Sequence, residues 1–246
     1  MIFDYYILNY LTYIILIPGI LLSLWAQIRV KTTFKKYSKV GVAEGKTAYQ
    51  FARRLLNKNG CQDVRILDVA GELTDHYNPK NKTLSLSTSV MDFESVAAVG
   101  VAAHECGHAV QDHKGTVMFK LRSALVPITN IGTFLATPLI IIGIILLYVT
   151  TAWQQYANYI ILAGLCCYSL SALFCLVTLP VELDASRRAK KMLIETGDIT
   201  QEELKGVSKV LNAAAMTYVA SLFVSLLSLL RLVVIVLSMS GRAKRD

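Results

Sequence analysis

The sequence predicts an integral membrane, α-helical protein with about four transmembrane segments and a small α+β domain. Two observations indicate this class. The chain of 246 residues is 54% hydrophobic, and its mean hydropathy of +0.48 lies far above that of an ordinary soluble domain. Long apolar runs are separated by two polar segments, 30–122 and 180–216, which provide the residues for a water-soluble part.

Each of the four apolar runs reaches the ~20 residues that are needed to cross a bilayer. We expect transmembrane helices at 5–28, 124–149 and 159–179, and a transmembrane or re-entrant helix at 218–239. The last run is interrupted by Arg231. An arginine at this position snorkels, faces the protein interior, or marks a segment that does not fully span the membrane.

Basic residues predict how the chain is oriented. The loop TTAWQQYAN between the second and third apolar runs contains no Lys or Arg, whereas the ends of the first and third runs are strongly basic. The positive-inside rule therefore places both polar segments in the cytoplasm. The tail GRAKRD disagrees, because a fourth complete span would carry it outside. The basic clusters consist of Arg29, Lys31, Lys35, Lys36 and Lys39, and of Arg187, Arg188, Lys190 and Lys191.

Charge and cysteine usage exclude two classes of protein. The formal net charge of +8 does not require nucleic acid as a partner, because anionic membrane lipid accounts for basic residues beside apolar runs. We therefore expect membrane lipid, and not nucleic acid, as a partner. The five cysteines form no C-x-x-C pair and no disulfide framework. Cys106 is interpreted as a small apolar filler rather than a ligand or nucleophile.

The first polar segment contains a helix followed by two strands. TAYQFARRLLNKNG is typical of a helix that ends at Gly60, and VRILDVA is typical of a strand. NPKN predicts a turn. KTLSLSTS alternates as a half-exposed strand does, with Leu84 and Leu86 on one face and hydroxyl side chains on the other.

The stretch VGVAAHECGHAVQDHKG, residues 99–115, carries the residues best suited to chemistry. His104 and His108 stand four apart, so on a helix they share one face and can bind one Zn²⁺ ion. Glu105 lies one step round the helix. It can reach a water on the metal without being a ligand, which suits a general base. The alternative is a buried helix whose histidines satisfy hydrogen bonds in the core.

The residues around this motif support a helix. The run 93–110 is rich in Ala and Val at helical spacing, with Asp92 as the expected N-cap and Gly115 as the expected stop. In the longer H-E-x-x-H-x-x-G-x-x-H pattern, the third histidine would fall on Lys114. His113 is therefore expected to be a histidine at the helix end and not a ligand.

A catalytic zinc ion needs a third protein ligand and an open position for water. The remaining histidine is His76, and the best carboxylates are Glu182 and Asp184 in LPVELDASRRAKK. Pro180 suits the first turn of a helix, so a new helix is expected where the third apolar run ends. Two spans intervene, so this segment lies on the same membrane side as the histidine helix. The alternative is a membrane-exit helix with solvated charges.

The strand before the histidine helix is a candidate for binding substrate. A strand in this place can line an active-site cleft, and a peptide can add to its edge in extended form. The candidate substrate-binding residues are Thr83, Leu84, Ser85 and Leu86. The alternative is an ordinary strand of a sheet.

The chain resembles the YugP-like family of bacterial membrane zinc metallopeptidases over nearly its full length, in LTDHYNPKNKTLSLS, GVAAHECGHAVQ and LPVELDASRRA. That family is similar, more distantly, to the HtpX and CAAX-prenyl-protease group of membrane gluzincins. In this group the third ligand is the Glu of an E-[FY]-x-A-D segment beyond a transmembrane hairpin. Compared with ELDAS, the pattern implies Glu182 as the ligand. It departs at Ser186, where the wider group has an Asp that supports a zinc-bound histidine. Asp184 or Asp75 would take over that support.

The resemblance implies a gluzincin-like metalloprotease domain in a multi-pass protein of the bacterial plasma membrane. The activity expected is that of a zinc-dependent endopeptidase acting on membrane-associated or misfolded proteins, with Glu105 as the base. One catalytic Zn²⁺ would be held by His104, His108 and Glu182. The developing oxyanion needs a second donor, for which the candidates are His76, Tyr77, Arg187 and Arg188.

A different class of function remains open at this point. The chain would then be a catalytically weak, zinc-binding scaffold whose spans bind other membrane proteins. Glu105 argues against this alternative, because a structural zinc site has no need of a base and usually closes its fourth position.

Overall fold

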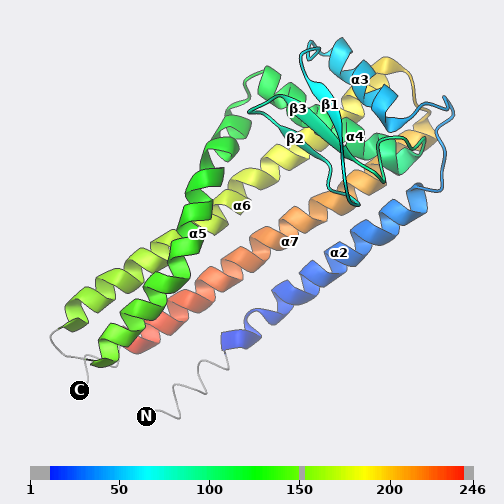
Figure 1. The fold of residues 1–246 in the computed structure, drawn as a ribbon. Coiled ribbons are helices and arrows are strands. Elements are labelled where there is room, and N and C mark those ends of the chain that lie inside the picture. Colours follow the sequence, from blue (N-terminus) through cyan, green and yellow to red (C-terminus); the bar gives the residue numbers. More distant parts are fainter. Residues whose placement is uncertain (1–11, 150–152, 241–246) are drawn as a thin grey trace. The chain divides into compact units, whose positions relative to one another are not determined.

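The computed structural model describes residues 12–149 and 153–240. The chain is mostly helical, with one small sheet (Figure 1). The helices are α2 (Ile17–Tyr37), α3 (Ala48–Lys58), α4 (Val96–His113), α5 (Val117–Val149), α6 (Gln154–Thr196) and α7 (Gln201–Ser240). The strands are β1 (Arg65–Val69), β2 (His76–Asn78) and β3 (Thr83–Ser87).

The chain divides into two compact units. The helical unit consists of the described residues within Met1–Leu24, Arg122–Val177 and Val219–Asp246. The mixed unit consists of Trp25–Leu121 and Thr178–Tyr218, and it contains the sheet, α3 and α4. Helices α2, α5, α6 and α7 each contribute residues to both units.

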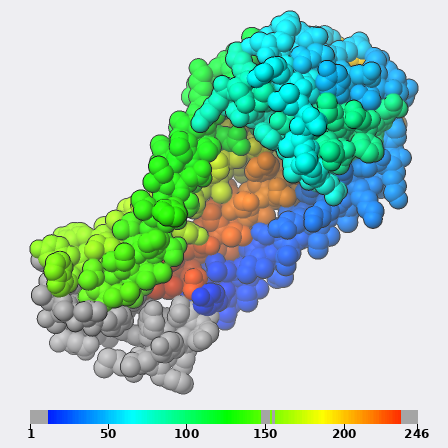
Figure 2. Space-filling view, in the orientation of Figure 1, coloured from blue at the N-terminus to red at the C-terminus, as the bar shows by residue number. Residues whose placement is uncertain are grey.

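Within the described residues, four helices are long and apolar enough to cross a membrane, as the sequence predicts. Their candidate spans are Thr12–Tyr37, Val117–Leu146, Tyr156–Thr196 and Gln201–Ile235. Residues 5–11 of the first predicted span lie outside the described residues. On α5, Ile131 and Phe134 are 62% and 77% exposed, and Figure 2 shows one face of this helix (green) uncovered. Such a long apolar surface suits contact with lipid.

Glycines bring α5 and α6 together in the helical unit. A Cβ atom on Gly143 would lie 2.5 Å from the Ile161 side chain and 3.1 Å from the Ala157 carbonyl oxygen. Gly164 on α6 makes the reciprocal contact with Ile140 of α5. Small residues let helix backbones approach closely, which is a common basis of helix association in membranes.

Arg231 does not interrupt α7, which is continuous through this position. Its guanidinium lies 3.9 Å from the centre of the Tyr13 ring, within the range of a cation–π contact. The charge is thus directed toward another helix of the same unit. The basic tail GRAKRD lies outside the described residues.

The sheet of the mixed unit has the order β1-β3-β2. Strand β1 runs parallel to β3, whereas β2 runs antiparallel to it, and both Ile66 and Tyr77 pair with Leu84. The sequence predicts only two strands, because the three residues of β2 are too few to show a periodic pattern. All five residues of β3 are buried, so the prediction of a half-exposed strand is wrong. The Thr83 and Ser87 hydroxyls are satisfied by the side chains of Asn81 and Asp75.

The central position of β3 also overturns the substrate-binding prediction. A peptide can add only to a free strand edge. Strand β1 pairs with residues 83–87 on one side of β3, and β2 pairs with residues 83–85 on the other. The edge role proposed for Thr83, Leu84 and Ser85 is therefore wrong, and Leu86 is fully buried and pairs with Asp68 of β1. The free edges of this sheet belong to β1 and β2.

Helix α4 forms the centre of the mixed unit, and nearly all of its residues are buried. It begins after Ser95, whose side chain accepts a hydrogen bond from the Ala98 amide. The prediction of Asp92 as N-cap is wrong, because the chain just before Ser95 is tied to the segment after α2. There the Val42 amide donates to the Glu94 carbonyl at 2.8 Å. The predicted stop is confirmed, since Gly115 has φ +62° just beyond the helix end.

Helix α6 runs through Pro180 without a break. The prediction that a new helix begins at Pro180 is therefore wrong. Proline removes one backbone hydrogen bond from a helix. Long membrane-type helices tolerate this loss because neighbouring polar groups can satisfy the freed carbonyl. The segments 180–216 and 218–239 were likewise predicted as separate, but α7 is continuous from Gln201. The segment that carries Glu182 therefore belongs to the same continuous helix as the third apolar run, 159–179.

Candidate metal centre

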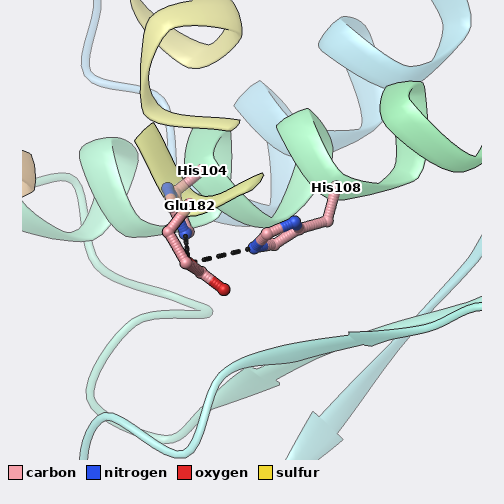
Figure 3. Close-up of side chains that lie close together, drawn as sticks. All are labelled: His104, His108 and Glu182. Carbon is pink, nitrogen blue, oxygen red and sulfur yellow. Dashed lines mark hydrogen bonds and ion pairs between the residues drawn. The ribbon is translucent and has the colours of Figure 1, made fainter. Parts of the chain in front are cut away.

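Two helices of the mixed unit bring the three predicted ligands together. His104 and His108 lie one turn apart on α4, and Glu182 lies on α6. Glu182 Oε2 is 3.1 Å from His104 Nε2 and 3.4 Å from His108 Nε2 (Figure 3). One ligand atom from each residue lies within 4.8 Å of the others. Residues 74 positions apart in the chain thus meet at one point.

The two separations from Glu182 fit a zinc ion, whereas the three ligand atoms as a set lie within 4.8 Å of one another. Tetrahedral Zn²⁺ with bonds of ~2.0–2.1 Å to nitrogen and oxygen holds its ligand atoms about 3.3–3.4 Å apart. The two distances from Glu182 Oε2 are close to this value. Two imidazoles and one carboxylate also match the three-ligand sets of catalytic zinc sites, in which the fourth position takes water or substrate.

Gly107 allows the two helices to touch beside these ligands. A Cβ atom on Gly107 would lie 2.5 Å from the Ala185 carbonyl oxygen and 3.2 Å from Ala185 Cα. Any larger side chain would therefore push α4 away from the backbone of α6. The spacing of the histidines does not predict this role, because it depends on which helix packs against α4.

The outer nitrogen of each histidine also has a partner. His108 Nδ1 lies 3.0 Å from Gln111 Oε1, and His104 Nδ1 lies 3.1 Å from Ser186 Oγ. Ser186 stands where the wider group has an Asp, and its hydroxyl occupies the supporting position. Asp75 was a candidate for this support, but its carboxylate instead accepts hydrogen bonds from Ser87. Asp184 reaches His108 only through Gln111.

Comparisons with known proteins agree with this site. Residues 12–237 match the family model described as "Putative neutral zinc metallopeptidase". The chain belongs to this family of zinc metallopeptidases. It is 44% identical over 217 residues to the "Putative membrane protease YugP" of Bacillus subtilis (strain 168). The matched region covers 88% of this chain and 92% of that protein. No solved structure matches the chain.

Membership of the metallopeptidase family confirms the predicted resemblance and supports a membrane location. The Bacillus subtilis relative is named a membrane protease, and this chain has four helices that are long and apolar enough to span a bilayer. The family name also implies zinc, for which the group of His104, His108 and Glu182 supplies a suitable set of donors.

Charges near the site raise the pKa of His108. Burial by itself would lower the pKa of His108, but the Glu182 carboxylate, and then that of Glu105, raise it above its usual value. A metal binds only the neutral imidazole, so protons compete with the metal at this ligand. Glu105 is itself buried on α4 and is not one of the three grouped ligands, as expected of a base.

The candidate oxyanion donors differ in how far their polar groups are already engaged. The Tyr77 hydroxyl donates to Asp112 at 2.8 Å, and burial together with this bond raises its pKa. Arg187 and Arg188 both pair with Asp184. His76 is exposed on the edge strand β2, with Nδ1 2.9 Å from the Thr74 carbonyl.

Cys106 and His113, which also lie in the stretch 99–115, face away from the candidate metal centre. The Cys106 thiol donates to the Ala52 carbonyl of α3 at 3.6 Å, and burial raises its pKa well above the usual value. It therefore stays a neutral thiol, in agreement with the predicted filler role. His113 packs against Gly60 at the end of α4, as expected for a histidine at a helix end.

Sequence reasoning gave Gln111 no role. It lies three residues after His108, so both side chains share one helix face. That spacing could have indicated a contact between Gln111 and His108. It could not indicate which residues of α6 Gln111 binds. Gln111 Nε2 donates to the Val181 carbonyl and to Asp184 Oδ2, each at 2.9 Å.

Proposed function

We propose that this protein is a membrane-embedded, zinc-dependent endopeptidase with a gluzincin-like site. The observation that carries the proposal is the meeting of His104, His108 and Glu182 at separations suited to one Zn²⁺ ion. A fourth residue, Glu105, supplies a carboxylate between the two histidines in sequence. The family name supports both the metal and the class of reaction.

Metal binding and proton transfer are assigned to different residues of the site. His104, His108 and Glu182 would hold the ion, and Zn²⁺, when bound, acidifies a water and polarises the scissile carbonyl. Glu105 accepts the proton of the attacking water and passes it to the leaving amine. Among the ligand side chains, His104 is 15% exposed, against 8% for His108 and 2% for Glu182.

Strand β2 takes the substrate-binding role that was predicted for β3. It is an edge strand of the sheet, so an extended peptide can pair with its free side. Tyr77 of β2 packs near Phe119, which in turn lies against His108. His76 on the same strand is the favoured oxyanion donor, because Tyr77, Arg187 and Arg188 are already held by aspartates.

The proposed orientation places this site in the cytoplasm of a bacterial cell, in a multi-pass protein of the plasma membrane. Basic clusters follow the first and third apolar runs, in accord with the positive-inside rule. The substrates proposed are membrane-associated or misfolded proteins, because anchoring keeps the site near the bilayer. Membrane lipid and other membrane proteins are the remaining partners in this proposal.

Cysteine labelling tests the orientation. The five native cysteines are first replaced, and single cysteines are then placed at Lys82 or Gln154. In intact cells, a reagent that cannot cross the membrane should label the cysteine at position 154 and miss the one at 82. The reverse pattern would place the site outside the cell.

Zinc-dependent cleavage tests the activity itself. Purified protein is incubated with an unfolded, casein-like substrate before and after removal of metal by a chelator. Cleavage should stop when zinc is removed and return when zinc is restored. A zinc-loaded protein that cleaves neither this substrate nor an unfolded membrane protein would favour the scaffold alternative.

A further inference from the structure

Gln111 is a buried polar side chain at the contact between α4 and α6. None of its surface is exposed. Its amide makes three contacts with polar groups, to His108 Nδ1 at 3.0 Å and to the Val181 carbonyl and Asp184 Oδ2 at 2.9 Å each. A buried amide costs free energy unless its groups are satisfied. This one is satisfied only when α4 and α6 are correctly aligned.

The protons of this network can be assigned by counting donors and acceptors. A glutamine amide nitrogen has two protons and its oxygen has none. Val181 O and Asp184 Oδ2 are both acceptors, so they take both amide protons. Gln111 Oε1 must then accept, which requires His108 Nδ1 to donate. The opposite orientation of the amide would place its oxygen against two other oxygen acceptors.

This assignment determines which nitrogen of His108 can bind a metal. With the proton on Nδ1, the neutral imidazole keeps its lone pair on Nε2. Nε2 is the atom that faces Glu182 Oε2, at 3.4 Å. Gln111 therefore selects the tautomer of His108 that a metal at this site requires.

Asp184 is in turn fixed by two arginines on its own helix. Arg188 Nε lies 2.6 Å from Asp184 Oδ2, the same oxygen that Gln111 contacts, and Arg187 binds the other oxygen. A carboxylate is a stronger acceptor than a neutral group, and hydrogen bonds in a chain polarise one another. Asp184 thus orients the Gln111 amide, and through it the His108 ring.

The same amide also holds the segment that carries the third ligand. Val181 and Asp184 lie on either side of Glu182 in the sequence, and both are bound by Gln111 from α4. One side chain therefore orients a ligand of α4 and fixes the position of α6 around the ligand of that helix.

We propose that Gln111 and Asp184 form a positioning relay, which selects the metal-binding tautomer of His108 and sets Glu182 in register with it. The inference rests on the proposed zinc site. Neither residue is a ligand, and both act through His108 and Glu182.

His104 provides an internal contrast. Its Nδ1 lies 3.1 Å from the hydroxyl of Ser186. A hydroxyl can donate or accept, so this contact does not select a tautomer. Ser186→Ala should accordingly weaken zinc binding less than loss of the Gln111 amide does.

The test compares Gln111→Leu with wild type in the full-length, detergent-purified protein. Zinc affinity is measured by competition with a chelator, and ligand geometry by the visible absorption of the Co²⁺-substituted protein. The relay predicts an affinity loss of about 10–100-fold, the usual range for a group that orients a ligand, and an altered Co²⁺ spectrum.

Ser87→Ala is the matched control for lost stability. Ser87 is also fully buried and hydrogen-bonded, but its partner is Asp75, which lies just before strand β2. It should keep the wild-type zinc affinity and Co²⁺ spectrum even if its melting temperature falls. An equal loss of affinity in Ser87→Ala and Gln111→Leu would overturn the relay, since general destabilisation would then explain both.

Asp184 supplies a second arm. Asp184→Asn keeps an oxygen acceptor for Gln111, whereas Asp184→Ala removes it, so the alanine variant should lose more affinity than the asparagine variant. Wild-type affinity in both Gln111→Leu and Asp184→Ala would refute the relay while leaving the zinc site intact. A wild-type protein that takes up no zinc would refute the proposed function as well.

Discussion

Close helix contacts occur in both units, but their surroundings differ. In the helical unit, a Cβ on Gly143 or Gly164 would first meet a side-chain carbon, of Ile161 or Ile140 respectively, and would meet backbone atoms only at 3.1 Å. In the mixed unit, the three nearest atoms to a Cβ on Gly107 all belong to the backbone of Ala185. A side chain can move aside, whereas a helix backbone moves only with the residues it carries.

Those carried residues explain why the difference matters. Glu182 and Ser186 flank Ala185 on α6, and both contact histidines of α4. A shift of about 1 Å between α4 and α6 would separate ligands that must meet within a few tenths of an ångström. The helical unit instead presents apolar side chains, such as Phe134, to its surroundings. The spacing between α4 and α6 must therefore be precise for the ligands to meet, whereas the helices of the helical unit need only to pack.

Loss of a histidine should have the largest effect. His108→Ala removes one of three ligands, so we expect the purified protein to lose zinc and cleavage together. His113→Ala is the matched control, because His113 lies on the same helix but packs against Gly60. Metal analysis and a cleavage assay decide between them. Zinc retained by His108→Ala would remove this residue from the site.

The third ligand should give the next largest effect. Glu182→Gln should weaken zinc binding by more than about tenfold, because a neutral amide is a poor zinc ligand. Asp184→Asn should have a smaller effect, and Glu195→Gln, an exposed glutamate on the same helix, should have none. Zinc titration after chelator stripping measures all three. If Asp184→Asn emptied the site instead, the register of α6 against α4 would be wrong by two residues.

The glycine pair tests the comparison of the two units directly. Gly107→Ala should destabilise the protein by about 1–3 kcal/mol, as overpacking does, and should also weaken zinc binding. Gly143→Ala should destabilise it without changing the zinc affinity, because its neighbours in the helical unit carry no ligand. Thermal unfolding and zinc titration are measured on both variants. Equal zinc affinities in the two would show that the α4–α6 spacing is less critical than we infer.

The sequence was sufficient for the elements whose signals are local. The four apolar runs predicted the four candidate spans, and Gly60 and Gly115 marked the ends of α3 and α4. Local signals failed where tertiary contacts decide. A proline often lies in the first turn of a helix, but α6 continues through Pro180. The order of the strands placed β3 at the centre of the sheet, and no local pattern encodes that order.

The candidate site divides in the same way. The H-E-x-x-H spacing predicted His104, Glu105 and His108 from one helix, whereas the assignment of Glu182 needed a family resemblance. Asp184 was one of two candidates for a support, but the roles of Gln111 and Ser186 were missed because their contacts join two helices. Gln111 could have been suspected from its spacing to His108, but its contacts with Val181 and Asp184 depend on how α6 packs.

The most direct test of the account separates metal binding from catalysis at Glu105. Zinc content and cleavage of an unfolded substrate are measured for purified wild type and Glu105→Gln. Because Glu105 is assigned as the base and not as a ligand, the variant should hold one zinc ion as wild type does and should lose cleavage. Cleavage by Glu105→Gln at the wild-type rate would contradict the proposed peptidase mechanism.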